Sequence, residues 1–181
     1  ENGEFLTQRE IARMALIHPH VDQLTLSLSA PGMSALELPT DQGGQRVGVT
    51  IWKDGGVGAI DQGDQVADWL STFLRQNVRL VRFADDFFRQ VSQDYAPRES
   101  DQVGFADGYP FLFISEASLA DLNSRLEIPL PMNRFRPNIV IADTEPYAED
   151  TWKVVRIGDM LFDVVKPCAR CPIPNIDPAT G

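Results

Sequence analysis

The spacing of hydrophobic residues most constrains the fold of this chain, because in several segments every second residue is apolar, as in β-strands. Leucine alternates with threonine and serine from Leu24 to Ser29. Val47, Val49 and Ile51 alternate with other residues in the same way. A period of two residues predicts a half-buried strand in each place.

Short apolar runs extend this interpretation along the chain. They occupy segments 14–17, 79–83, 110–114 and 139–141. We expect a strand at 79–83 and buried strands at 110–114 and 139–141. Segments 154–159 and 161–165 predict a hairpin with Gly158 and Asp159 at the turn.

Only two segments have helical spacing. An apolar stripe at positions i, i+3, i+4 and i+7 predicts a helix over residues 65–75, with Asp64 as its N-cap; the stripe consists of Val66, Trp69, Leu70 and Phe73. A second helix is expected to begin near Ser115 and to bury Leu119, Leu122 and Leu126. The predicted fold class is therefore α+β and β-rich, most simply a pair of small α+β or barrel-like units.

The segment 91–103 is the expected domain boundary, because it is polar, unpatterned and lacks apolar anchors. We predict that it is mobile and separates domains 1–95 and 96–181. Residues 1–3 resemble the turn of a hairpin whose first strand is missing, and residues 175–181 resemble a loop that leads onward. We therefore expect a fragment in which both domains are truncated.

Charge excludes several classes of partner. The net charge is −10, which disfavours binding to nucleic acids or to anionic membranes. No window of about 18 apolar residues predicts a transmembrane helix. Only two cysteines are present, which suits a reducing compartment, so we expect a cytoplasmic protein without nucleic-acid or membrane partners.

The two cysteines, Cys168 and Cys171, are three positions apart with Arg170 between them. A redox disulfide of the thioredoxin type normally opens a helix, but prolines follow here immediately. A structural zinc site needs four ligands, and the remaining candidates, His18 and His20, lie at the far end of the chain. These two readings are therefore disfavoured. The others are one thiolate that ligates a soft metal held by a cofactor, or two small buried cysteines, which the spacing alone favours.

Positive charge gathers in the last quarter of this acidic chain, where it suits one small anion. If the segment around Arg134 and Arg136 is extended, both side chains share a face and, with Asn138, suit a phosphate and the edge of a heterocycle. The alternative is a pair of surface arginines bridged to nearby carboxylates: Glu145, Glu149 or Asp150. We interpret Glu149, Asp150 and Asp159 as members of a solvated acidic surface.

Ser115 at the expected helix start has two readings. The free backbone N–H groups of a helix N-terminus can bind an anion. The alternative is a plain N-cap, which most helices have.

Several strings together resemble the MOSC family, named for the C-terminal domain of molybdenum cofactor sulfurase. They are Asn133–Ile141, Tyr147–Trp152, Ile157–Asp159, Cys168–Cys171 with Asp177–Gly181, and Ser115–Asn123. The first part of the chain, from Phe5 to Gly32, is similar to the β-barrel domain that precedes MOSC. Within the family, the chain most resembles the mitochondrial amidoxime reducing component and its bacterial relatives, and the resemblance covers nearly the whole chain.

This resemblance implies a pterin-based molybdenum cofactor (Moco). It implies that Cys171 is the protein ligand to molybdenum and the catalytic residue. The implied cofactor-binding residues are Arg136, Asn138, Arg170 and the loop Asp107, Gly108 and Tyr109. Arg134 and Ser115, the anion-binding candidates named above, complete the set of expected cofactor-binding residues. In the mitochondrial members the loop that corresponds to 107–109 contains small residues with hydroxyl groups, which the present chain lacks at these positions. The family also has basic residues that contact the cofactor from an upstream segment, and that segment would lie before residue 1. Pyridoxal phosphate binding is a further expectation attached to the family.

The function implied by the resemblance is the reduction of N-hydroxylated small molecules. Electrons would come from an iron–sulfur or haem partner. A ferredoxin domain fused to the same chain would be one such donor. The alternative is a non-catalytic carrier or sulfur-transfer module that delivers Moco or sulfur through Cys171. A ferredoxin tail would favour the reductase, and a fused aminotransferase-like domain would favour sulfur transfer.

Overall fold

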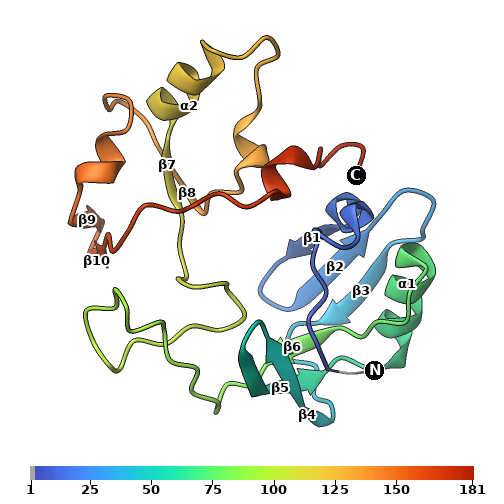
Figure 1. Ribbon diagram of the computed structural model, residues 1–181. Helices are drawn as coiled ribbons and strands as arrows, with labels where there is room; N and C mark the ends of the chain where they lie inside the picture. The colour runs from blue at the N-terminus through green and yellow to red at the C-terminus, as the bar shows by residue number, and fades with distance from the viewer. Residues whose placement is uncertain (1–2) are drawn as a thin grey trace. The chain divides into compact units, whose positions relative to one another are not determined.

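The computed structural model describes residues 3–181 and divides the chain into two compact units (Figure 1). Unit 1 comprises Glu1–Phe87 and Ile176–Gly181, and unit 2 comprises Phe88–Asn175. Glu1 and Asn2 lie outside the described residues, and with them most of the expected N-terminal turn. The expected boundary between the two domains, at residues 95 and 96, stays a prediction.

Unit 1 begins with a three-stranded antiparallel sheet. Its strands are β1 (His18–Val21), β2 (Thr25–Ser29) and β3 (Leu36–Pro39). The predicted strand at 24–29 is confirmed, but Leu24 lies outside it and is exposed. The apolar run 14–17 does not form a strand; most of it belongs to a 3₁₀-helix, Ala12–Leu16.

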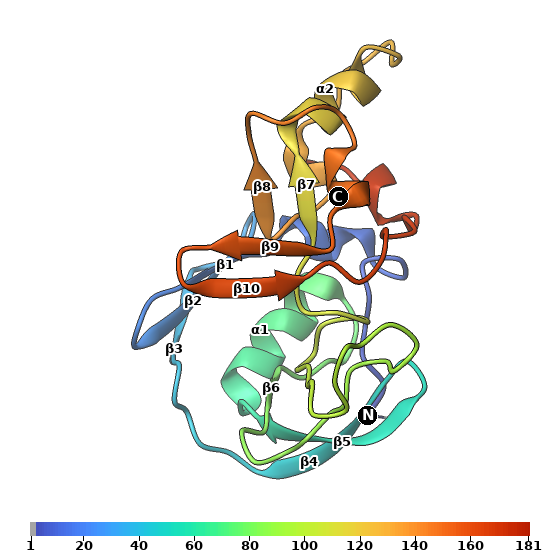
Figure 2. The same ribbon diagram turned by 90° about the vertical axis from the view of Figure 1, so that its left-hand side faces the viewer.

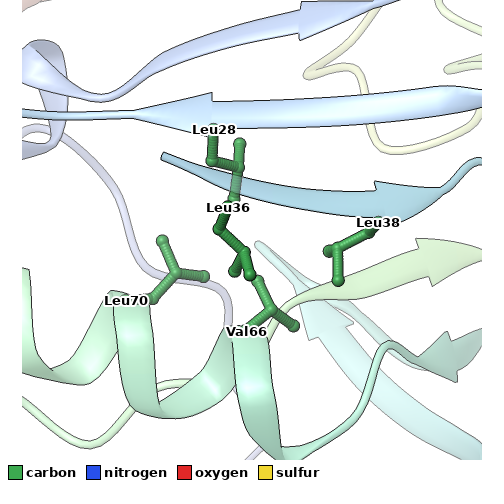
Figure 3. Packing of buried hydrophobic residues seen from close by; sticks show 5 residues of the cluster. All are labelled: Leu28, Leu36, Leu38, Val66 and Leu70. Atoms are coloured by element: carbon green, nitrogen blue, oxygen red, sulfur yellow. The ribbon is translucent and has the colours of Figure 1, made fainter. Parts of the chain in front are cut away.

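A second antiparallel sheet contains β4 (Arg46–Ile51), β5 (Asp54–Asp61) and β6 (Val81–Phe83). The strands predicted near 47–51 and 79–83 are thus confirmed. Helix α1 (Asp64–Leu74) follows β5 and confirms the first predicted helix. Figure 3 shows Val66 and Leu70 of α1 facing leucines of β2 and β3, a cluster completed by Leu28, Leu36 and Leu38.

The start of α1 differs from the prediction by one residue. Gly63 is the N-cap, with a φ of 90° that suits glycine, whereas Asp64 is the first helical residue. The carboxylate of Asp61 accepts a hydrogen bond from the Gly63 N–H at 2.7 Å. Arg79 bonds both Asp61 and Asp64, so the acid expected to cap the helix binds a guanidinium instead.

Unit 2 contains the segment expected to be a mobile loop. Residues 92–101 form neither helix nor strand, but Gln90 and Gln102 form an antiparallel bridge at its base. Val91 and Val103 beside this bridge are both 5% exposed. The expectation that the segment lacks apolar anchors is therefore wrong at its two ends.

The remainder of unit 2 consists of small elements. Strand β7 (Phe113–Ser115) pairs in parallel with β8 (Ile139–Ile141), and β9 (Val154–Ile157) pairs with β10 (Met160–Asp163) in an antiparallel hairpin (Figure 2). Helix α2 (Glu116–Asn123) directly follows β7. Three short 3₁₀-helices complete the unit: Met132–Arg134, Ala148–Thr151 and Ile173–Asn175.

The predicted hairpin at 154–165 is confirmed, with Gly158 at a positive φ of 58° in its turn. The strands expected to be buried are shorter and less buried than predicted, since Phe111 and Val140 are exposed. Among the described residues, β7 and β8 pair only with each other, which leaves both strands at an edge. Leu126 lies beyond the end of α2 and is also exposed. The α+β, β-rich class is confirmed.

Candidate cofactor site

Two hydrogen bonds join the segments that carry the arginines and the cysteines. A guanidinium N–H of Arg170 donates to the backbone carbonyl of Phe135 at 2.7 Å. The Nε–H of Arg134 donates to the carbonyl of Pro174 at 2.8 Å. Residues separated by 35 and 40 positions are thereby brought together within unit 2. The structure thus places both motifs of the sequence at one locality.

The backbone around the arginines is not extended, so the predicted shared face of Arg134 and Arg136 is wrong. Arg134 is the last residue of a 3₁₀-helix, and Arg136 has a φ of 53°. The Arg136 N–H donates to the Asn133 carbonyl, which closes a turn rather than continuing a strand. A left-handed conformation is unfavourable for a residue with a Cβ. Its presence directly before Pro137 marks a strained turn.

Asn138 anchors the entrance of β8. Its side-chain oxygen accepts a hydrogen bond from the Leu112 N–H at 2.9 Å, and its own N–H donates to the Leu112 carbonyl at 3.0 Å. These two bonds fix the start of β8 against the residue that precedes β7. The side chain therefore has a structural partner in addition to the predicted contact with a heterocycle.

The cysteines differ in exposure. Cys168 is exposed and Cys171 is half-buried, and the two do not form a disulfide. A guanidinium nitrogen of Arg170 lies 3.5 Å from the sulfur of Cys168. The alternative of two buried structural cysteines is thus wrong. Within residues 3–181, no three His, Cys, Asp or Glu side chains are grouped so that they could hold a metal ion.

The loop expected to line the site, Asp107 to Tyr109, is held by a residue that the sequence analysis missed. Arg89 is 7% exposed and donates to the carbonyls of Gly104 and Ala106 at 2.7 and 2.8 Å. Its position in an aromatic-rich stretch was the available signal for burial. No heavy atom of another residue lies within 4 Å of the position that a side-chain Cβ atom would occupy at Gly108, so the loop has open space at that point.

Ser115 is the N-cap of α2, which was the alternative to a role in anion binding. It is fully buried and caps α2, since its hydroxyl accepts a hydrogen bond from the Ser118 N–H at 3.0 Å. Its own N–H donates to a carboxylate oxygen of Glu149 at 2.9 Å. The anion at this helix start is therefore a side chain of the chain itself.

Glu149 is not the solvated surface acid that we predicted. It is half-buried and also accepts a hydrogen bond from the Ser118 hydroxyl at 2.7 Å. Burial raises the pKa of its carboxyl, but the bonds from Ser115 and Ser118 outweigh burial and hold the pKa below its usual value. The contact spans 34 positions, and no local pattern in the sequence indicates it.

Comparison with known proteins identifies two domains in the chain. Residues 100–181 match the MOSC domain, and residues 1–77 match the MOSC N-terminal beta barrel domain. The chain therefore carries a MOSC domain and a MOSC N-terminal beta barrel domain.

Among curated proteins, the chain is similar over its whole length to mitochondrial amidoxime-reducing component 1 of Mus musculus and of Homo sapiens, at 40% and 38% identity. It is 34% identical to mitochondrial amidoxime reducing component 2 of Bos taurus. It spans about half of each relative, 54% to 55% of their lengths. A solution structure of a Bordetella bronchiseptica protein aligns with 46% of this chain and 67% of its own, at 25% identity and a TM-score of 0.42.

The names of the relatives differ from the compartment that the composition predicted. None of the helices in the described part of the chain combines the length and apolar character needed to cross a bilayer. The relatives are named as mitochondrial proteins, whereas the composition predicted a cytoplasmic one.

Proposed function

We propose that this chain is a Moco-binding module of a reductase that acts on N-hydroxylated compounds, with Cys171 as the protein ligand to molybdenum. The observation that carries the proposal is the pair of hydrogen bonds, Arg170 to Phe135 and Arg134 to Pro174. They gather arginines and a half-buried thiol from two distant segments. The names of the relatives support the substrate class, because an amidoxime is an N-hydroxylated amidine.

The residues at this locality fit an anionic pterin and a soft metal. Thiolate is a ligand that soft metals select, and Cys171 is only half-buried, so its sulfur is not sealed within a core. A guanidinium carries five donors, so Arg134 and Arg170 can keep their backbone acceptors and bind a phosphate as well. The open space at Gly108 leaves room beside the Asp107–Tyr109 loop.

When bound, the cofactor supplies two-electron chemistry at molybdenum, and the protein supplies a ligand, orientation and electrostatics. The overall reaction takes an N–OH group to N–H and water, and consumes two electrons and two protons. The electrons would come from an iron–sulfur or haem donor. In this scheme Cys171 would hold the metal, while Arg134, Arg136 and Arg170 would neutralise the phosphate. Asn138 keeps the β8 entrance in place through Leu112.

The alternative of a non-catalytic carrier or sulfur-transfer module stays a prediction. The relatives are named for amidoxime reduction, which favours the reductase. The domain boundary at 95/96, the cytoplasmic compartment and pyridoxal phosphate binding likewise stay predictions.

The test is metal analysis combined with pterin fluorescence on full-length protein from a host that makes Moco. We expect near-stoichiometric molybdenum and pterin, and reduction of benzamidoxime to benzamidine when a reduced iron–sulfur or haem donor is supplied. Protein that binds pterin and molybdenum but reduces no N-hydroxylated compound would favour the carrier. Absence of both from such a host would contradict the proposal altogether.

A further inference from the structure

The ammonium group of Lys166 lies over two tyrosine rings. Its nitrogen is 5.1 Å from the ring centroid of Tyr95 and 5.6 Å from that of Tyr109. Both distances fall within the range of cation–π attraction. Lys166 follows β10 and comes directly before Pro167 and the cysteines, whereas the two tyrosines belong to the loops between Val91 and β7. One cation therefore connects the cysteine segment with two loops of the same unit.

Other contacts connect the same parts of unit 2. Arg98 in the 92–101 loop pairs with Asp163, the last residue of β10, at 3.3 Å. The hydroxyl of Tyr109 donates to the carbonyl of Ser92 at 3.4 Å. At the loop base, the Val103 N–H donates to the Arg89 carbonyl at 2.9 Å. The loop is thus held at its base, and its tip contacts the chain that leads to the cysteines.

We propose that Lys166 is a positioning residue, whose cation between Tyr95 and Tyr109 holds the Pro167–Cys171 segment and thereby the thiol of Cys171. Pro167 has a fixed φ, which removes one backbone rotation between the held lysine and the segment that follows. The importance of Cys171 for catalysis rests on the proposed function. The coupling between Lys166 and the thiol does not, and it can be measured without cofactor.

The exposure of the groups limits the expected size of the effect. Tyr95 is 54% exposed, and an exposed cation–π pair shifts an opening equilibrium by roughly two- to fivefold. The Arg98–Asp163 pair is also exposed and contributes less, because solvent and salt screen it. Removal of the lysine charge should therefore loosen the segment without unfolding unit 2.

The two cysteines provide a measurement with an internal control. Cys171 is half-buried, so its alkylation reports opening of the segment, whereas Cys168 is already exposed. Trypsin cleaves after Arg170 and so places the two cysteines on different peptides. The ratio of the iodoacetamide labelling rates of Cys171 and Cys168 can then be read by mass spectrometry on the cofactor-free, full-length protein.

We expect Lys166→Met to raise this ratio roughly two- to fivefold. Tyr95→Leu should act in the same direction, while Lys166→Arg and Tyr95→Phe should keep the wild-type ratio because they retain the cation and the ring face. Amide exchange over residues 92–103 should accelerate in Lys166→Met and recover in Lys166→Arg. The positioning role is overturned if Lys166→Met and Tyr95→Leu leave the ratio unchanged, or if Lys166→Arg is as disruptive as Lys166→Met. A protein that shows the expected ratios but never holds molybdenum would contradict the proposed function alone.

Discussion

Arg170 donates a hydrogen bond to the backbone carbonyl of Phe135 at 2.7 Å, and this contact joins the two segments that carry the candidate site. The guanidinium also lies near the Phe135 ring, 5.9 Å from its centroid, and 3.5 Å from the sulfur of Cys168. One arginine thus organises the turn before Pro137 and one of the two thiols. The two cysteines thus have different surroundings, Cys168 exposed and Cys171 half-buried, which leads to the first prediction.

Cys171→Ser should abolish molybdenum retention, because a hydroxyl is a poor ligand for a soft metal at neutral pH. Cys168→Ser should have a much smaller effect, since Cys168 is exposed and is assigned no metal contact. Molybdenum and pterin per chain, measured on both variants purified in parallel, provide the check. Equal loss in the two variants would indicate a site made by the cysteine pair and would refute the single-ligand assignment.

Arg136→Lys should weaken cofactor binding although the charge is retained, because lysine cannot form the planar fork of a guanidinium. The expected cost is about 1–3 kcal/mol, the range for a charge-assisted hydrogen bond left unmade. Pterin occupancy under limiting cofactor measures the effect. Arg125→Lys is the matched control, since Arg125 pairs with Asp121 on the surface of α2. An Arg136→Lys variant that fills with pterin as readily as the control would remove Arg136 from the site.

Regular patterns in the sequence were sufficient to predict the elements that bury an apolar face. The alternation that contains Leu26 and Leu28 predicted β2, and the stripe that contains Val66 and Leu70 predicted α1. These residues pack together in unit 1, so local periodicity and tertiary burial agree.

The site depends on features without such a period. The left-handed turn at Arg136 is unfavourable for that residue type, and local propensity therefore predicts an extended strand entrance instead. Glu149 accepts a hydrogen bond from Ser115, 34 positions away in the sequence. The carbonyls that accept hydrogen bonds from Arg89 are 15 and 17 positions away. The motifs identified which residues belong together, but long-range hydrogen bonds decide how they are held.

Glu149→Gln should reduce the acid sensitivity of unit 2. The folded-state pKa of Glu149 is depressed, so its contribution to stability is present above the unfolded pKa of about 4.3 and is lost as the pH falls below that value. Above that pH the variant should be less stable by about 1 kcal/mol, because a neutral amide accepts weaker hydrogen bonds than a carboxylate. The difference should disappear under more acidic conditions.

Thermal unfolding of Glu149→Gln and wild type between about pH 3 and pH 7 tests this prediction. Glu145→Gln serves as the matched control, since Glu145 lies in the same connection and is exposed. If Glu149→Gln and wild type unfold with the same pH dependence, the carboxylate is not a stabilising acceptor for the start of α2.

Limited proteolysis should cut first in the loop between Val91 and Val103, and bound cofactor should protect it. The buried valines and the bridge between Gln90 and Gln102 hold the loop base, so we expect cuts within residues 93–101 rather than at its ends. Protection by cofactor is expected because the loop contacts the chain that leads to Cys171 through Lys166 and Asp163. Full-length protein with and without Moco, treated with a protease of low specificity and followed by mass spectrometry, gives the order of cuts. If cleavage is confined to residues 41–45 while 92–103 resists in both states, both the flexible segment and the domain boundary at residues 95/96 are misplaced.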